Sequence, residues 1–290
     1  MTDAPFPLGH FAPRMNVWAE LTRAEITQAR DVRALVVIPT GATEQHGDHL
    51  ATGTDSFLAT AVAELAAARV SSPRILVTPP VSVGFSPHHL SWAGTLSLRL
   101  DTYLSVLRDV AMSVIATGFH RAVFVNGHGG NSAPLRALCG ELVTDGHAVG
   151  MVDYFAPGHV GWSALLDGQL AVAGHACEYE TALTMALTTG ANRARIKDAS
   201  AGLPPRLVQP WMRSGDTDPI SAHGAGWPPI FQSDDCGYWG DPSAASLEVG
   251  EAMLEATVSA LARFYVDFAQ ADLRVGLSAN PNTARHAPKV

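Results

Sequence analysis

The sequence is poor in lysine and in positive charge generally. Only 19 of the 290 residues are Lys or Arg, against 27 Asp or Glu, and the only lysines are Lys197 and Lys289. The resulting net charge of −8 argues against a surface that binds nucleic acid, because phosphate backbones need clustered cations. It also leaves no basic cluster that would hold a membrane surface. We therefore expect neither a nucleic-acid nor a membrane partner.

Long apolar runs, a signal segment and cysteine pairs are also lacking. The best apolar stretches, at 34–39 and 61–70, are far shorter than the roughly 18 residues of a membrane-spanning helix. Residues 1–15 show no basic start followed by an apolar stretch, so no secretory signal is indicated. The three cysteines are widely spaced without a Cys-x-x-Cys pair, which suits a reducing compartment. We expect a soluble, cytoplasmic protein.

What the sequence does contain is an alternation of short β-branched runs with longer helical patterns. The runs are near-continuously apolar, as in a parallel sheet that is covered on both faces. We predict an α/β fold, a three-layer α/β/α sandwich with a mostly parallel sheet and its site at the carboxyl ends of the strands. The expected strands are 34–38, 74–78, 121–125 and 148–153, and the expected helices are 22–31, with a capping box of Thr22 and Glu25, 54–70, 101–117, 132–144, 178–189 and 243–269.

The domain organisation is predicted to be simple. Residues 1–272 are expected to form one domain, because the length allows one large domain and no repeat or low-complexity tract is present. The Pro- and Gly-rich segment 204–242 is too long for an ordinary connection, so we expect either a lid or a subunit interface. The tail 273–290 is expected to be mobile.

Polar side chains follow three of the predicted strands, where a parallel sheet delivers its chain to one edge. They are Glu44, His46 and Asp55 after the first strand, His88 and His89 after the second, and His128 after the third. Carboxylates and imidazoles without thiolates suit Zn, Mn or Fe(II), and an Asp can bridge two ions. Asp55 starts the next predicted helix, so its carboxylate either turns back to the site or caps that helix. The coincidence favours a metal site over isolated structural histidines.

Two acidic residues, Glu178 and Glu180, begin a later predicted helix. On a regular helix they lie about 200° apart, so at most one of them faces the site. The simpler interpretation is that both favour the positive end of the helix dipole.

Together these residues resemble the three signature motifs of the creatininase (creatinine amidohydrolase) family. The motifs occur in the family's order, from about residue 21 to residue 262. They are Glu44-Gln-His46-Gly with Asp55 eleven positions after the Glu, Asn126-Gly-His128-Gly-Gly-Asn131, and His175-Ala-x-Glu178-x-Glu180-Thr.

The resemblance implies a hexameric, dinuclear metal hydrolase with two divalent ions, Zn or Mn or both, or Fe(II). In this family a hydroxide that bridges the ions attacks a carbonyl, and the expected reaction is cleavage of the C–N amide bond of a small cyclic substrate. His175 matches the proton-transferring histidine, and Glu178 is expected to orient it or to act as a base. The ligands implied are Glu44, Asp55 and His128 for one ion and His46, Asp55 and Glu180 for the other.

The chain departs from the members that open creatinine. Those members have an aromatic and an acidic residue where this chain has Gly129 and Gly130, and a tryptophan where it has Ala171. Two other hydrolases therefore stay open, a peptidase and a C–C hydrolase of keto-sugars with the same centre. From another class, Gly127–Asn131 before a helix could bind a nucleotide or another anion without turnover.

Overall fold

The computed structural model describes residues 14–170, 173–207 and 236–277. Its centre is a sheet of four parallel strands in the order β2-β1-β3-β4. The strands are β1 Leu35–Thr40, β2 Ile75–Val77, β3 Ala122–Asn126 and β4 Val149–Asp153. The predicted strands are confirmed with shifts at their ends, and β1 and β3 reach further toward their carboxyl ends than predicted.

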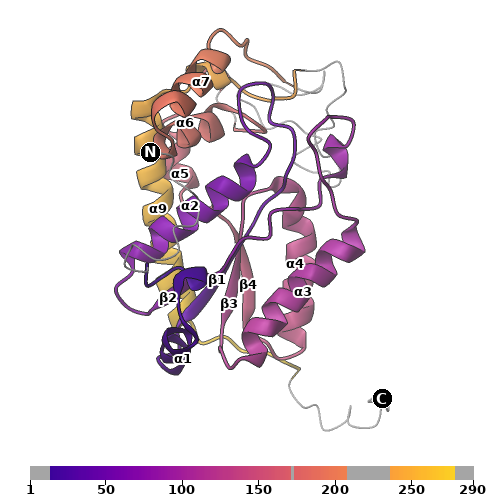
Figure 1. The fold of residues 1–290 in the computed structure, drawn as a ribbon, viewed down its shortest axis with the longest axis vertical. Coiled ribbons are helices and arrows are strands. Elements are labelled where there is room, and N and C mark those ends of the chain that lie inside the picture. The colour runs from indigo at the N-terminus through magenta and orange to yellow at the C-terminus, as the bar shows by residue number, and fades with distance from the viewer. Residues whose placement is uncertain (1–13, 171–172, 208–235, 278–290) are drawn as a thin grey trace.

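Helices cover both faces of the sheet, which confirms the three-layer α/β/α fold (Figure 1). Within β1, Leu35 and Val37 pack on one face while Val36 and Ile38 pack on the other, because successive side chains of a strand alternate. Helices α2, α5, α6 and α9 cover the first face, and α1, α3 and α4 cover the second. Their bounds are α1 Arg23–Asp31, α2 Thr54–Arg69, α3 Leu100–Ala116, α4 Gly129–Thr144, α5 His159–Ser163, α6 Glu178–Leu187 and α9 Leu247–Gln270.

The helical segments differ from the prediction in a few places. The expected helix 243–269 is divided into a 3-10 turn, Pro242–Ala244, and α9, because the Ser246 side chain accepts a hydrogen bond from the Val249 amide and caps the longer helix. The short α5 and a further helix, α7 Gly190–Ser200, were not predicted. The capping box of Thr22 and Glu25 is present at the start of α1. The described part of the chain also contains the 3-10 turns Trp18–Glu20 and Pro87–His89.

Most of the segment 204–242, and most of the tail, lies outside the described residues. The ends of the segment pack together, since the Tyr238 hydroxyl donates a hydrogen bond to the Pro204 carbonyl and Arg206 pairs with Gly240. Among the helices that are described, none combines the length and the hydropathy needed to cross a bilayer.

Two helical glycines give a paired test of this packing. A Cβ at Gly250, in the first turn of α9, would overlap the Ala182 carbonyl of α6, whereas a Cβ at the exposed Gly140 in α4 would meet nothing within 4 Å. We expect Gly250→Ala to lower the free energy of unfolding by about 1–3 kcal/mol through overpacking. Gly140→Ala should raise it by up to about 1 kcal/mol through helix propensity. Urea denaturation measures both, and shifts of the same sign would contradict the packing described.

Candidate metal centre

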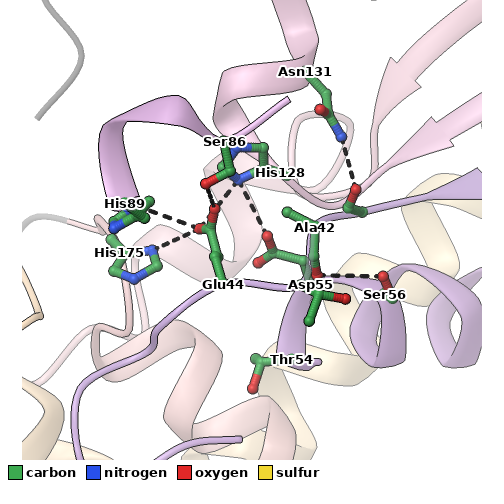
Figure 2. Close-up of polar contacts among 12 residues, drawn as sticks. Ala42, Glu44, Thr54, Asp55, Ser56, Ser86, His89, His128, Asn131 and His175 are labelled. Atoms are coloured by element: carbon green, nitrogen blue, oxygen red, sulfur yellow. Dashed lines mark hydrogen bonds and ion pairs between the residues drawn. The ribbon is translucent and has the colours of Figure 1, made fainter. Parts of the chain in front are cut away.

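The carboxylates and imidazoles singled out in the sequence meet at the carboxyl edge of the sheet. Glu44 follows β1, Asp55 lies in the first turn of α2, and His128 stands between β3 and α4. Figure 2 shows Glu44 and Asp55 side by side with His128 above them. Glu44 and His46 are fully buried, and Asp55 is 2% exposed. The sheet therefore brings together side chains that are more than 80 positions apart in the sequence.

Asp55 lies between two imidazoles. Its Oδ1 is 3.0 Å from His46 Nε2, and its Oδ2 is 3.1 Å from His128 Nδ1. Of the two orientations open to it, the carboxylate takes the one that turns back to the site, and no side chain caps α2. Its two oxygens therefore face two different ring nitrogens, as a carboxylate that bridges two ions would.

Glu44 stands among three imidazoles, one of them the His128 ring that also faces Asp55 (Figure 2). Its Oε1 is 3.2 Å from His128 Nδ1, 3.3 Å from His175 Nδ1 and 3.5 Å from His89 Nε2. Ser86 donates a very short hydrogen bond to the other oxygen, Oε2. Within the described residues, neither Glu44 Oε1 nor Asp55 Oδ2 has a hydrogen-bond partner, although both are buried. Buried polar atoms are seldom left in that state, so these two oxygens indicate a missing partner.

The imidazoles are held so that one nitrogen of each faces the carboxylates. His46 Nδ1 donates to the Glu44 carbonyl, His128 Nε2 to the Phe85 carbonyl and His175 Nε2 to the Gln45 carbonyl, at 3.1, 3.2 and 2.6 Å. Because a carbonyl only accepts, each neutral ring keeps its lone pair on the nitrogen that faces the site. Metal-binding histidines are oriented in this way by a second-nitrogen hydrogen bond.

The electrostatics agree with a site built for cations. Burial would lower the pKa of His46, but the Asp55 carboxylate raises it to about 10. Burial would also lower the pKa of His128, but the carboxylates of Glu44 and Asp55 outweigh this effect and raise it well above its usual value. Burial raises the pKa of Glu180 to about 7. Without metal, protons on His46 and His128 balance the carboxylates.

Four groups of three residues lie at this edge, and within each group the potential ligand atoms are no more than 4.8 Å apart. Together they contain every metal ligand implied by the resemblance, and also His88, His89 and His175. The residues present therefore fit divalent metal ions. The triads are Glu44, His46 and Asp55; His46, His175 and Glu180; Glu44, His88 and His128; and Glu44, His89 and His175.

The two acidic residues of α6 point in different directions. The Glu180 carboxylate accepts a hydrogen bond from the Ala176 amide at 2.6 Å and belongs to a ligand triad. The Glu178 carboxylate instead accepts from the amides of Asp167 and Gly168, at 2.9 and 3.0 Å, and belongs to none of the four triads. As the helical geometry required, only one of the pair faces the site.

Sequence reasoning missed several residues that support the site. Gln45 donates to His89 Nδ1 at 3.0 Å through its amide nitrogen, while its amide oxygen accepts from the Gly47 amide. Asn131 joins two loops, since it accepts from the Phe85 amide and donates to the Gly41 carbonyl. Their only sequence signal was their place inside or beside the motifs.

A cavity of about 920 Å³ opens onto these ligands. Glu44, Asp55, His128, His175 and Glu180 lie on its polar side. The rest of its lining is mostly aromatic and apolar and includes Tyr154, Phe155, Trp162, Leu166, Tyr179 and Trp239. Such a combination of an apolar wall with a few convergent polar groups is typical of a substrate pocket.

The site does not favour an anion. Any anion at the start of α4, beside His128, would lie close to the buried carboxylates of Glu44 and Asp55. Like charges in so buried a place repel strongly. The site therefore favours a bound cation over the nucleotide or anion that the glycine-rich segment had left open.

The chain has an α/β/α fold, with buried carboxylates and imidazoles at one edge of its parallel sheet that line a pocket. These features define it as a metal-binding protein with a pocket of the kind found in enzymes. A sequence model described as "Creatininase: Creatinine amidohydrolase" matches residues 19–265. The chain belongs to the creatininase family of metal-dependent hydrolases.

Curated relatives and solved structures agree with this family. The chain is 31% identical to the mycofactocin precursor peptide peptidase of Mycobacterium ulcerans (strain Agy99) over 261 residues, which cover 87% of this chain and 94% of the relative. It is 33% identical to the creatinine amidohydrolase of Pseudomonas putida over 103 residues, 34% of this chain and 38% of the relative. A solved structure of creatininase with Mn superposes with a TM-score of 0.70 at 25% identity, covering 89% of this chain and 100% of that one.

The pKa shifts predict that metal binding displaces protons. Metal-free His46 is protonated at pH 7, because its pKa is raised to about 10, and the raised pKa of His128 favours its protonated form. A ligating imidazole must be neutral. Zn²⁺ should therefore release protons, and its apparent affinity should rise from pH 6 to pH 8. Calorimetric titration of the metal-free protein in buffers of different ionisation enthalpy measures this. An apparent enthalpy independent of the buffer would contradict it.

Proposed function

We propose that the chain is a dinuclear metal-dependent hydrolase of C–N amide bonds. The observation that carries this proposal is the position of Asp55, whose two oxygens face His46 on one side and His128 on the other. Glu44, Asp55 and His128 would hold the first ion, and His46, Asp55 and Glu180 would hold the second. Bound divalent ions would lower the pKa of a water molecule and polarise the carbonyl that it attacks.

His175 is the proposed proton carrier. Its ring lines the cavity, its Nε2 is fixed by the Gln45 carbonyl, and its Nδ1 lies 3.3 Å from Glu44 Oε1. Burial holds the pKa of His175 well below its usual value, so the resting ring is neutral and able to accept a proton. We propose that it takes a proton from the attacking water and delivers it to the leaving nitrogen.

Glu178 is proposed as a positioning residue and not as a base. Its carboxylate binds two amides of the loop at Asp167 and Gly168, and the neighbouring Leu166 lines the cavity. Glu178 would therefore fix one wall of the pocket from outside the reacting centre.

A peptide is the substrate class that the site supports best. The cavity of about 920 Å³ is near the upper end of pockets for drug-sized ligands, so it has room for several residues of a peptide beside the ions. The relatives that match along most of this chain are peptide peptidases. The second candidate is the small cyclic amide, which the likeness to creatininase structures favours.

Three further features belong to the proposal. The ions are Zn²⁺ or Mn²⁺, since solved creatininases exist in Mn and Zn–Zn forms. The chain assembles into a homo-oligomer, a hexamer by family likeness, which light scattering measures; the exposed Leu90, Leu96 and Leu100 offer it apolar surface. Its location is cytoplasmic, where its three free thiols would stay reduced.

Asp55→Asn tests the shared ligand. We expect the variant to retain fewer than one ion for each chain and to lose at least about 100-fold in kcat/KM, because even outer-shell changes at metal sites cost 10–100-fold. The matched control is Asp101→Asn, which changes the second residue of another helix, exposed and outside both the ligand triads and the cavity lining. Metal analysis after gel filtration and activity assays measure both variants. Two ions retained in Asp55→Asn would refute the bridging assignment.

A substrate panel tests the class of amide. Short peptides, cyclic amides and formamides would be offered to the Zn²⁺- and Mn²⁺-loaded protein, with and without a chelator. We expect turnover of peptides with a kcat/KM at least about tenfold above that for any cyclic amide, equivalent to about 1.4 kcal/mol of transition-state binding. Preferential turnover of a cyclic amide would support the second candidate. Binding without turnover, insensitive to the chelator, would contradict the hydrolase.

A further inference from the structure

His88 stands beside the proposed first ion but outside its ligand set. One of its ring nitrogens, a Glu44 carboxylate oxygen and a His128 ring nitrogen all lie within 4.8 Å of one another. The rings of His88 and His128 are nearly parallel, with centroids 5.5 Å apart and 12° between their planes. His88 also lines the cavity. Its imidazole therefore has the reach to contact an ion held by Glu44 and His128.

The backbone that carries His88 is tied to the same two ligands. Phe85 accepts a hydrogen bond from His128 through its carbonyl, and Ser86 donates one to Glu44 through its hydroxyl. The 3-10 turn Pro87–His89 follows at once. The position of His88 is therefore coupled to the side chains that would hold the first ion.

Glycine at position 130 leaves the space in which the two rings stack. A Cβ at Gly130 would overlap His128 Nε2 and would lie 2.9 Å from His88 Cε1, whereas a Cβ at the adjacent Gly129 would meet nothing within 4 Å. A side chain at 130 and the His88 ring thus compete for one volume beside His128. In this chain the His88 imidazole fills it.

Of the two adjacent histidines, only His88 has its ring nitrogens available. His89 Nδ1 accepts a hydrogen bond from the Gln45 amide nitrogen, so a neutral His89 carries its proton on Nε2, the atom that faces Glu44 Oε1 at 3.5 Å. That proton excludes a metal ion from the nitrogen. Within the described part of the chain, no hydrogen bond or ion pair engages the His88 imidazole.

We propose that His88 is a further protein ligand of the first metal ion, beside Glu44, Asp55 and His128; this assignment rests on the proposed function. The first ion would then have two imidazoles and two carboxylates, whereas the proposed set for the second ion would supply one imidazole and two carboxylates. Imidazole suits Zn²⁺ better than Mn²⁺, and carboxylate suits Mn²⁺. His88 therefore biases the first position toward Zn²⁺.

The test compares the wild type with three variants, each prepared metal-free and then reloaded with Zn²⁺ or Mn²⁺. His88→Phe keeps a ring of similar size without a ligand atom, His88→Glu replaces imidazole by carboxylate, and His120→Gln is a control at an exposed histidine away from the site. Metal analysis after gel filtration gives the ions retained, and chelator competition gives the Zn²⁺ and Mn²⁺ affinities at each position.

We expect the wild type and His120→Gln to retain about two Zn²⁺ ions for each chain. His88→Phe should retain about one, with the weaker position at least about tenfold poorer in Zn²⁺ affinity. His88→Glu should retain two and shift the ratio of the Zn²⁺ and Mn²⁺ affinities toward Mn²⁺. If His88→Phe does not fold, as judged by circular dichroism, His88→Gln takes its place and must also lose affinity.

His88→Phe with two ions at wild-type affinity would overturn this assignment alone, even if its KM were raised. Unchanged metal affinity together with a raised KM would indicate that His88 contacts the substrate and not the ion. A wild-type chain that retains one ion or none would instead contradict the proposed dinuclear function, and the assignment of His88 with it.

Discussion

The constraint on which the site depends is the burial of two carboxylates against imidazole lone pairs. Glu44 Oε1 and Asp55 Oδ2 lie in the protein interior with no hydrogen-bond partner among the described residues when the facing imidazoles are neutral, and backbone carbonyls fix the rings of His46, His128 and His175 around them. Acceptors that converge on acceptors are unfavourable unless a cation stands between them. Protons fill this role in the metal-free chain, and divalent ions do so in a working enzyme.

The fold brings these carboxylates and imidazoles together without placing them in its hydrophobic core. β1 and β3 are adjacent and parallel, so the segments after them leave the same edge of the sheet. Apolar side chains of both strands fill the two faces, and the polar side chains begin only where the strands end. The carboxylates are therefore buried by loops and helix starts, and they are not embedded in the hydrophobic core itself.

Much of this arrangement could be predicted from the sequence, because it depends on regular geometry. The strand ends located Glu44, Asp55 and His128, and the 200° between positions 178 and 180 required that only one of them face the site. The strand ends also located His88 and His89, but the contacts of Gln45 and Ser86 with the site depend on irregular loop conformation, which periodicity does not encode. The break before α9 depended on one serine cap, and the short α5 is below the length at which a helical period can be recognised.

The proposed substrate class rests on the pocket more than on the ions, since curated relatives of the chain carry the names of different hydrolases. An aromatic wall and a large volume favour a peptide here. The central claim, however, is the pair of ions about Asp55. Anomalous diffraction at the Zn and Mn edges, from crystals of the reloaded protein, tests it most directly. The account predicts two peaks, one on either side of the Asp55 carboxylate, while a single peak or none beside Asp55 would contradict it.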